Sequence, residues 1–190
     1  MTMTEIIDPQ IASTAMEEDY ENNKSGMLER FIEINTIIPL KENVMHTGGF
    51  QGQFALHEIG NSYVNGNYMA VVLLTQAFIE HSLASILLMK GEEIDAESGF
   101  FKVIKKSREI DVVNEEEVAE LHELRKIRNS YVHPKFELKN GSLDKRFIDG
   151  GYSDPVLMAK DHAVTAIKIL KVFMDNSVGF STWDDGTESA

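Results

Sequence analysis

The apolar run from Tyr68 to Met89 constrains the fold of this 190-residue chain more than any other segment. Apolar side chains occupy almost every helical position of the run, which is typical of a helix surrounded by other helices. Polar side chains lie near its middle, among them Gln76, Glu80 and His81. A membrane-spanning helix rarely tolerates such a mixture. We therefore expect a buried helix of a soluble protein, with no membrane partner.

Helical spacing of apolar residues recurs on both sides of this run, whereas no segment alternates as a strand would. Stop and start signals divide the pattern, among them Pro39, Gly91 as a cap and the pair Asp154-Pro155. Asn114 followed by Glu117 resembles a capping box. We expect loops at 41–53 and 138–152, the second with a small hairpin around Asn140-Gly141. Helices are expected at 13–23, 27–38, 54–64, 68–89, 100–108, about 114–132 and from 155 to about 174.

These elements predict an all-α fold, an antiparallel helical bundle of four to five main helices. A chain of this length is the natural size of one domain. We expect an acidic, partly flexible N-terminal segment at 1–24, a single helical bundle domain at 25–178 and a flexible acidic tail at 179–190.

The net charge of −13, from 18 basic and 31 acidic residues, argues against binding of nucleic acid over the protein surface in general. The charge is unevenly spread, however. Acidic residues gather near both ends of the chain, whereas residues 125–146 contain seven basic and two acidic side chains. One inner stretch of the chain is therefore basic.

Cysteine is absent, which excludes disulfides, thiolate metal sites and thiol nucleophiles. The segment from Met1 to Gln10 has no basic region of the kind that begins a signal peptide. These features predict a cytoplasmic protein. The pair His57-Glu58 lacks the second histidine of a zinc-protease motif, and the remaining histidines lack metal-ligand spacing. We expect no metal and no cofactor.

The segment from Arg128 to Pro134 is the most informative for function. Residues five apart on a helix lie about 140° apart and roughly 7.5 Å along its axis, so Arg128 and His133 would not normally converge. Because His133 precedes a proline, its backbone is pushed out of the helical region, and an arginine in the last turns can reach toward it. A guanidinium offers fixed charge, and an imidazole can transfer a proton near neutral pH. Cleavage of a phosphodiester without metal requires both functions.

A structural explanation of the same two residues stays open. An arginine near the end of a helix interacts favourably with the helix dipole. A histidine before a proline can simply cap the helix.

The pattern Arg128-Asn129-x-x-x-His133 at a helix end resembles the signature of the HEPN superfamily (higher eukaryotes and prokaryotes nucleotide-binding domains). The preceding long helix with Glu80 near its middle is also similar to many members, and the likeness covers about residues 54–176. The resemblance implies an antiparallel bundle that usually forms a homodimer. Active members cleave RNA without metal at a cleft between the protomers and leave a cyclic phosphate.

The resemblance also implies roles for individual residues. Arg128 would stabilise phosphate charge, His133 would transfer a proton and Asn129 would orient His133 or a phosphate oxygen. Glu80 matches the helix glutamate of many members. We expect Arg125, Lys126 and Lys135 to bind substrate.

Lys135 also marks a departure, because a common toxin subgroup of the superfamily has tyrosine at that place. The resemblance therefore does not transfer toxin behaviour, although a protein antitoxin is among the partners that it admits.

Two further features allow two interpretations each. Glu80 lies in an apolar helix and needs a partner, for which Arg125 and Arg128 are the expected candidates. It is either a counter-ion that locks two helices or a residue that positions Arg128. The basic residues of the 100–108 helix either form a solvated face or extend a surface for the RNA backbone: Lys102, Lys105, Lys106 and Arg108.

Three functions follow as hypotheses. The first is a metal-independent endoribonuclease of HEPN type that acts as a homodimer. The second is a non-catalytic HEPN-like module that binds a nucleotide, RNA or a partner protein. The third is a structural all-α partner protein in which the motif is coincidental.

Overall fold

The computed structural model describes residues 8–38, 48–133 and 138–176, and all regular structure in these ranges is helical. The predicted all-α class is thus confirmed. Five helices of 16 to 29 residues, α1, α2, α3, α6 and α8, form the bundle together with shorter ones. The elements are α1 (Pro9–Ile37), α2 (Gly49–Val64), α3 (Tyr68–Met89), α4 (Glu93–Ala96), α5 (Phe100–Glu109), α6 (Glu115–Val132), α7 (Leu143–Asp149) and α8 (Pro155–Asn176).

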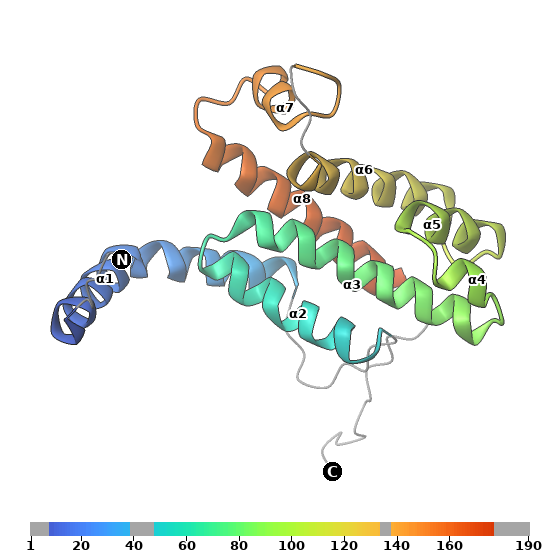
Figure 1. Cartoon of the computed structure of the whole chain (residues 1–190), viewed down its shortest axis with the longest axis horizontal. Helices are drawn as coiled ribbons and strands as arrows, with labels where there is room; N and C mark the ends of the chain where they lie inside the picture. The colour runs from blue at the N-terminus through green and yellow to red at the C-terminus, as the bar shows by residue number, and fades with distance from the viewer. Residues whose placement is uncertain (1–7, 39–47, 134–137, 177–190) are drawn as a thin grey trace, which may run out of the picture.

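Helix α3 lies at the centre of the bundle, as its lack of a polar face predicts (Figure 1). It packs against α2, α4, α5, α6 and α8, and its bounds agree with the predicted ones. Val72, Phe78 and Leu83 are fully buried on different sides of this helix. By length and composition α3 is also the one helix of the described ranges that could cross a membrane, and 56% of its most apolar window is buried in the bundle.

The end of α3 is closed by Gly91, as expected. Gly91 has a φ of +82°, a backbone conformation that favours glycine. The amide of Glu92 donates to the carbonyl of Leu87 at 3.0 Å, and that of Gly91 to Leu88. This is the Schellman arrangement, which turns the chain sharply out of a helix.

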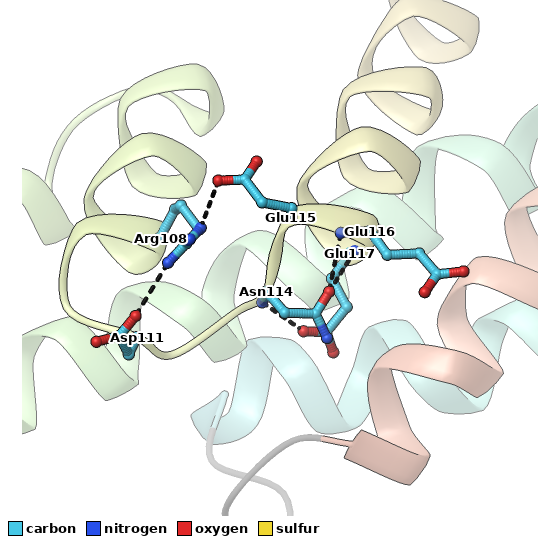
Figure 2. A network of polar contacts seen from close by, with 6 residues as sticks. All are labelled: Arg108, Asp111, Asn114, Glu115, Glu116 and Glu117. Atoms are coloured by element: carbon cyan, nitrogen blue, oxygen red, sulfur yellow. Dashed lines mark hydrogen bonds and ion pairs between the residues drawn. The ribbon is translucent and has the colours of Figure 1, made fainter.

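A capping box starts α6, the helix that carries the Arg128 motif (Figure 2). The Asn114 side chain accepts from the amides of Glu116 and Glu117, at 2.9 and 3.0 Å. In return, the Glu117 carboxylate accepts from the Asn114 amide at 2.8 Å. These bonds satisfy amides that the first turn would otherwise leave unpaired.

Arg108 joins the end of α5 to the start of α6 (Figure 2). Its Nε atom donates to Glu115 at 2.8 Å, and its Nη1 atom donates to Asp111 at 2.9 Å. The predicted outward face of α5 is therefore partly engaged in ion pairs at this turn.

The N-terminal helix differs from the expected short one. A single helix, α1, runs from Pro9 to Ile37 without a break at Gly26, and it crosses the expected domain boundary after residue 24. The Asp8 carboxylate accepts from the Gln10 amide at 2.8 Å and starts the helix eight residues after the chain begins. One glycine costs a helix only about 1 kcal/mol, which explains why the break is absent. The first half of α1 extends away from the bundle (Figure 1).

Helix α2 begins at Gly49, within the loop that was predicted at 41–53. Residues 49–53 are helical, and the glycines near them face α3 closely. A Cβ atom on Gly52 would lie 3.8 Å from the Phe78 ring, and one on Gly48 would lie 3.1 Å from the Ser82 hydroxyl. Gly48 and Gly52 therefore allow α2 and α3 to pack closely, whereas the sequence pattern predicted a loop at this place.

The predicted hairpin around Asn140-Gly141 is wrong. Gly141 has a φ of +81° and leads into helix α7, whose first turn is capped by the Ser142 side chain accepting from the Lys145 amide at 3.2 Å. The flanking residues lack the alternation that pairs two strands. Helix α8 begins at Pro155 as predicted, with Asp154 accepting from the Val156 amide at 2.8 Å. Helix α7 lies beside the end of α6 and the start of α8 (Figure 1).

Candidate functional site

The predicted motif lies at the C-terminal end of α6, as expected. Val132 is the last helical residue, and His133 follows in an extended conformation with φ −111° and ψ 105°. Its amide still donates to the Asn129 carbonyl at 3.1 Å. The conformation is the one that a following proline favours. The His133 side chain is consequently exposed and accessible to a ligand.

Arg128 contacts Asn129 directly. The Arg128 Nη1 atom donates to the Asn129 side-chain oxygen at 3.2 Å, and both side chains are half-buried. Within the described ranges no hydrogen bond links Arg128 to His133. The expected reach of the arginine toward the histidine is thus not observed, and Arg128 instead contacts the neighbouring amide.

Three of the predicted residues line one groove between α6 and the segment that holds α7. The groove has a volume of about 430 Å³. Its α6 wall consists of Arg125, Lys126 and Asn129. The opposite wall consists of Asn140, Gly141, Lys145, Arg146 and Asp149. We call this the α6–α7 groove.

Four basic side chains and one acidic side chain line the α6–α7 groove, and most of the basic ones have acidic neighbours. Arg146 and Lys126 lie 3.3 and 3.5 Å from Glu123, and Lys145 lies 3.1 Å from Asp149. Arg125 is the exception, since no acidic side chain of the described ranges lies within ion-pair distance. Its charge is therefore available to an anionic ligand.

Glu80 does not pair with either arginine. It is half-buried on α3 and accepts from the Gln76 side chain at 3.3 Å. No ion pair from Glu80 to Arg125 or Arg128 exists among the described residues, so the expected ionic link between α3 and α6 is not observed. Partial exposure removes the need for a cationic partner that full burial would impose.

The remaining predicted basic residues have different outcomes. Lys135 lies outside the described residues, so its predicted contact with substrate stays a prediction. Lys102 and Lys105 are exposed on α5, while Lys106 lies 3.1 Å from Glu92.

The sequence pattern missed the partners from α7. Lys145 and Arg146 end the basic stretch 125–146, and Arg125 and Lys126 begin it. The two ends of that stretch face each other across the groove. The excess of basic residues between 125 and 146 was therefore the sequence feature that indicated this groove. Only the turn before α7 shows that the two ends of this basic stretch lie together.

A contact between half-buried Tyr131 and buried His162, beside the motif, was also missed. The Tyr131 hydroxyl on α6 lies 2.9 Å from Nδ1 of His162 on α8. Burial and the nearby Arg146 charge lower the pKa of His162, against the opposing effect of Asp161 and Glu123. Burial raises the pKa of Tyr131 to about 12. Tyr131 and His162 are 31 positions apart, so helical periodicity could not predict their contact.

No group of three or more histidine, aspartate or glutamate side chains in the described part of the chain is arranged to hold a metal ion. Comparison with protein-family models, with curated proteins and with solved structures gives no match to this chain.

Proposed function

We propose that this protein binds single-stranded RNA in the α6–α7 groove and cleaves it without metal, as a cytoplasmic ribonuclease of HEPN type. The observation that carries the proposal is the gathering of four basic side chains around one groove in a chain of net charge −13. A local cationic groove can attract phosphates even where the overall field does not. Arg125 supplies charge that no acidic side chain within the described ranges neutralises.

The proposed reaction is attack of a ribose 2′-hydroxyl on its own phosphate. The O2′–P bond forms and the P–O5′ bond breaks, which yields a cyclic phosphate and a free 5′-hydroxyl. One group must remove the 2′ proton, and another must protonate the departing oxygen. The exposed imidazole of His133 suits one of these transfers near neutral pH.

Arg128 would stabilise the negative charge that develops on the phosphate. Its Nη1 atom is engaged with Asn129, and a guanidinium retains further donors for phosphate oxygens. Asn129 both holds Arg128 and lines the groove, so it would align the guanidinium with a bound phosphate.

A homodimer is part of the proposal. A single histidine performs one proton transfer, whereas the reaction needs two. A two-fold axis near His133 would bring in the second imidazole from an identical chain.

A non-catalytic binding module is the second candidate. It is favoured by the bond from Arg128 to Asn129, together with the absence of any described contact between Arg128 and His133. In that case the groove would hold RNA or a nucleotide without cleavage.

The experiment that tests the proposal compares cleavage of labelled single-stranded RNA by the full-length protein with and without EDTA. His133→Ala and Arg128→Ala are measured beside His57→Ala, a matched control because His57 is exposed on α2. We expect EDTA to have no effect, the DNA counterpart to stay intact and each motif variant to lose about 10²-fold or more in rate.

The outcomes separate the two candidates. RNA that is bound yet never cut by the wild type would support the binding module. Equal cleavage by wild type and both motif variants would refute the roles of Arg128 and His133.

A further inference from the structure

Three flat side chains cluster next to the α6–α7 groove. Phe101 on α5 stacks on His122 of α6, with ring centroids 5.4 Å apart and planes 27° from parallel. The guanidinium carbon of Arg125 lies 5.2 Å from the centroid of the Phe101 ring. Phe101 is nevertheless 52% exposed. We call these three residues the Phe101 cluster.

The Phe101 cluster is continuous with the groove. Arg125 belongs to both, because it contacts the Phe101 ring and lines the groove. His122 precedes Lys126 by four residues and Asn129 by seven, so the three share one face of α6. A strip of one helix face therefore leads from an aromatic surface at one end to a cationic groove at the other.

Polar contacts do not account for the arrangement of the Phe101 cluster. Nε of Arg125 and Nδ1 of His122 are buried and have no hydrogen-bond partner in the described structure. Burial and the charges of Arg125 and Lys126 lower the pKa of His122. The imidazole is then neutral at physiological pH, and its flat face extends the aromatic surface of Phe101.

We propose that the Phe101 cluster stacks an unpaired nucleobase of the RNA strand whose phosphates lie in the α6–α7 groove. The inference rests on the proposed function and adds a base-binding subsite, which requires that the bases of the bound strand are accessible. Aromatic rings and guanidinium planes are the usual stacking partners of unpaired bases. Because every base has a flat face, this subsite accepts bases with little regard to sequence.

The test measures binding of the full-length protein to two fluorescent probes of equal length. One is a single-stranded 2′-O-methyl oligonucleotide, which lacks the hydroxyl needed for cleavage. The other is an abasic phosphate backbone. Phe101→Ala and Phe101→Trp are compared with Phe54→Ala, a matched control because Phe54 is 70% exposed on α2.

We expect Phe101→Ala to weaken binding of the base-bearing probe by about 5- to 150-fold, the usual effect of one stacked base. Its affinity for the abasic probe should stay within about twofold of the wild type, since the phosphate contacts remain. Phe101→Trp should keep the affinity, and bound bases should quench its fluorescence beyond the response of the wild type, whose one tryptophan is Trp183. Phe54→Ala should bind both probes as the wild type does.

Other outcomes overturn the inference. An equal loss for both probes would mean that Phe101 acts on the groove instead of on bases. Binding of both probes with no loss in Phe101→Ala overturns the inference alone, whereas a wild-type protein that binds neither probe overturns the proposed function as well.

Discussion

Tyr131 and His162 join the last turn of α6 to α8 through a hydrogen bond of 2.9 Å between the hydroxyl and Nδ1. Their rings meet edge to face, with centroids 5.7 Å apart. His162 is only 8% exposed, so the contact is largely shielded from water. Because Tyr131 lies in the same turn as Arg128 and Asn129, this bond links the helix end that carries the motif to α8.

Loss of the Tyr131 hydroxyl should destabilise the protein. Tyr131→Phe keeps the ring and leaves the buried Nδ1 of His162 without its partner, which we expect to cost about 1–2 kcal/mol. The measurement is urea unfolding followed by circular dichroism. Tyr20→Phe, an exposed tyrosine on α1, is the control and should change stability by less than about 0.5 kcal/mol. An equal effect of the two changes would contradict the role given to the bond.

His162 should make stability depend on pH. Its pKa in the folded state lies below the ordinary value of about 6.5, so the unfolded chain binds this proton more readily. Stability is therefore fully present above about pH 6.5 and is lost as pH falls through that value toward the folded pKa. Thermal unfolding between pH 7.5 and 5.5 should show this loss in the wild type.

His162→Gln removes the titrating group and serves as the comparison for that experiment. The difference in melting temperature between wild type and His162→Gln should shrink as pH falls. His57→Gln, which changes an exposed histidine, should leave the wild-type profile unaltered. Parallel curves for wild type and His162→Gln would refute the assignment.

The capping box of α6 should contribute to stability through Asn114. Asn114→Ala removes the acceptor for two amides, and such caps are worth about 1 kcal/mol. Glu116→Gln, in the same first turn and exposed, is the matched control and should change the midpoint of urea unfolding little. A stable Asn114→Ala variant would show that packing alone starts the helix.

Arg125 should carry part of the salt dependence of RNA binding. Arg125→Ala removes one phosphate contact, which for a single strand lowers the slope of log K against log salt by about 0.7. Binding should weaken to a similar extent for RNAs of different sequence. Lys168→Ala, on the exposed face of α8, should leave the slope unchanged. An unchanged slope in Arg125→Ala would place the phosphates elsewhere.

The proposed homodimer should be visible in solution. Light scattering at micromolar concentration should give twice the 21.4 kDa mass of the chain. Because the axis is expected near His133, a spin label at that position should report a short distance to its symmetry mate. A strictly monomeric mass would remove the second imidazole from the proposed reaction.

Several helix ends in this chain, those of α3, α6 and the start of α8, could be predicted because they depend on neighbouring residues. Asn114 and Glu117 cap each other within one turn, and Gly91 adopts a conformation that few other residues reach. The bounds of α3 followed from the same kind of signal. The extended backbone of His133 is set by the proline after it. Each of these features involves residues only a few positions apart, so the order of residues along the chain is enough to predict it.

The composition of the candidate site could be predicted only in part. Arg125, Lys126 and Asn129 share one face of a helix, and periodicity alone places them together. Lys145 and Arg146 reach the same groove only because Gly141 and Ser142 turn the chain into α7. Glu80 was expected to face the arginines and contacts Gln76 instead.

Local order along the chain was thus sufficient for α3, α6 and the start of α8, and for one wall of the groove, whereas the unbroken α1, the early start of α2 and helix α7 differ from the prediction. The second wall lies 11 to 24 positions from the first along the chain, and the stacking of Phe101 on His122 and the bond between Tyr131 and His162 join residues 21 and 31 positions apart. Such contacts depend on how helices rotate and approach as their apolar faces pack. That rotation is set by the shape of the whole core, which no single segment of the sequence contains.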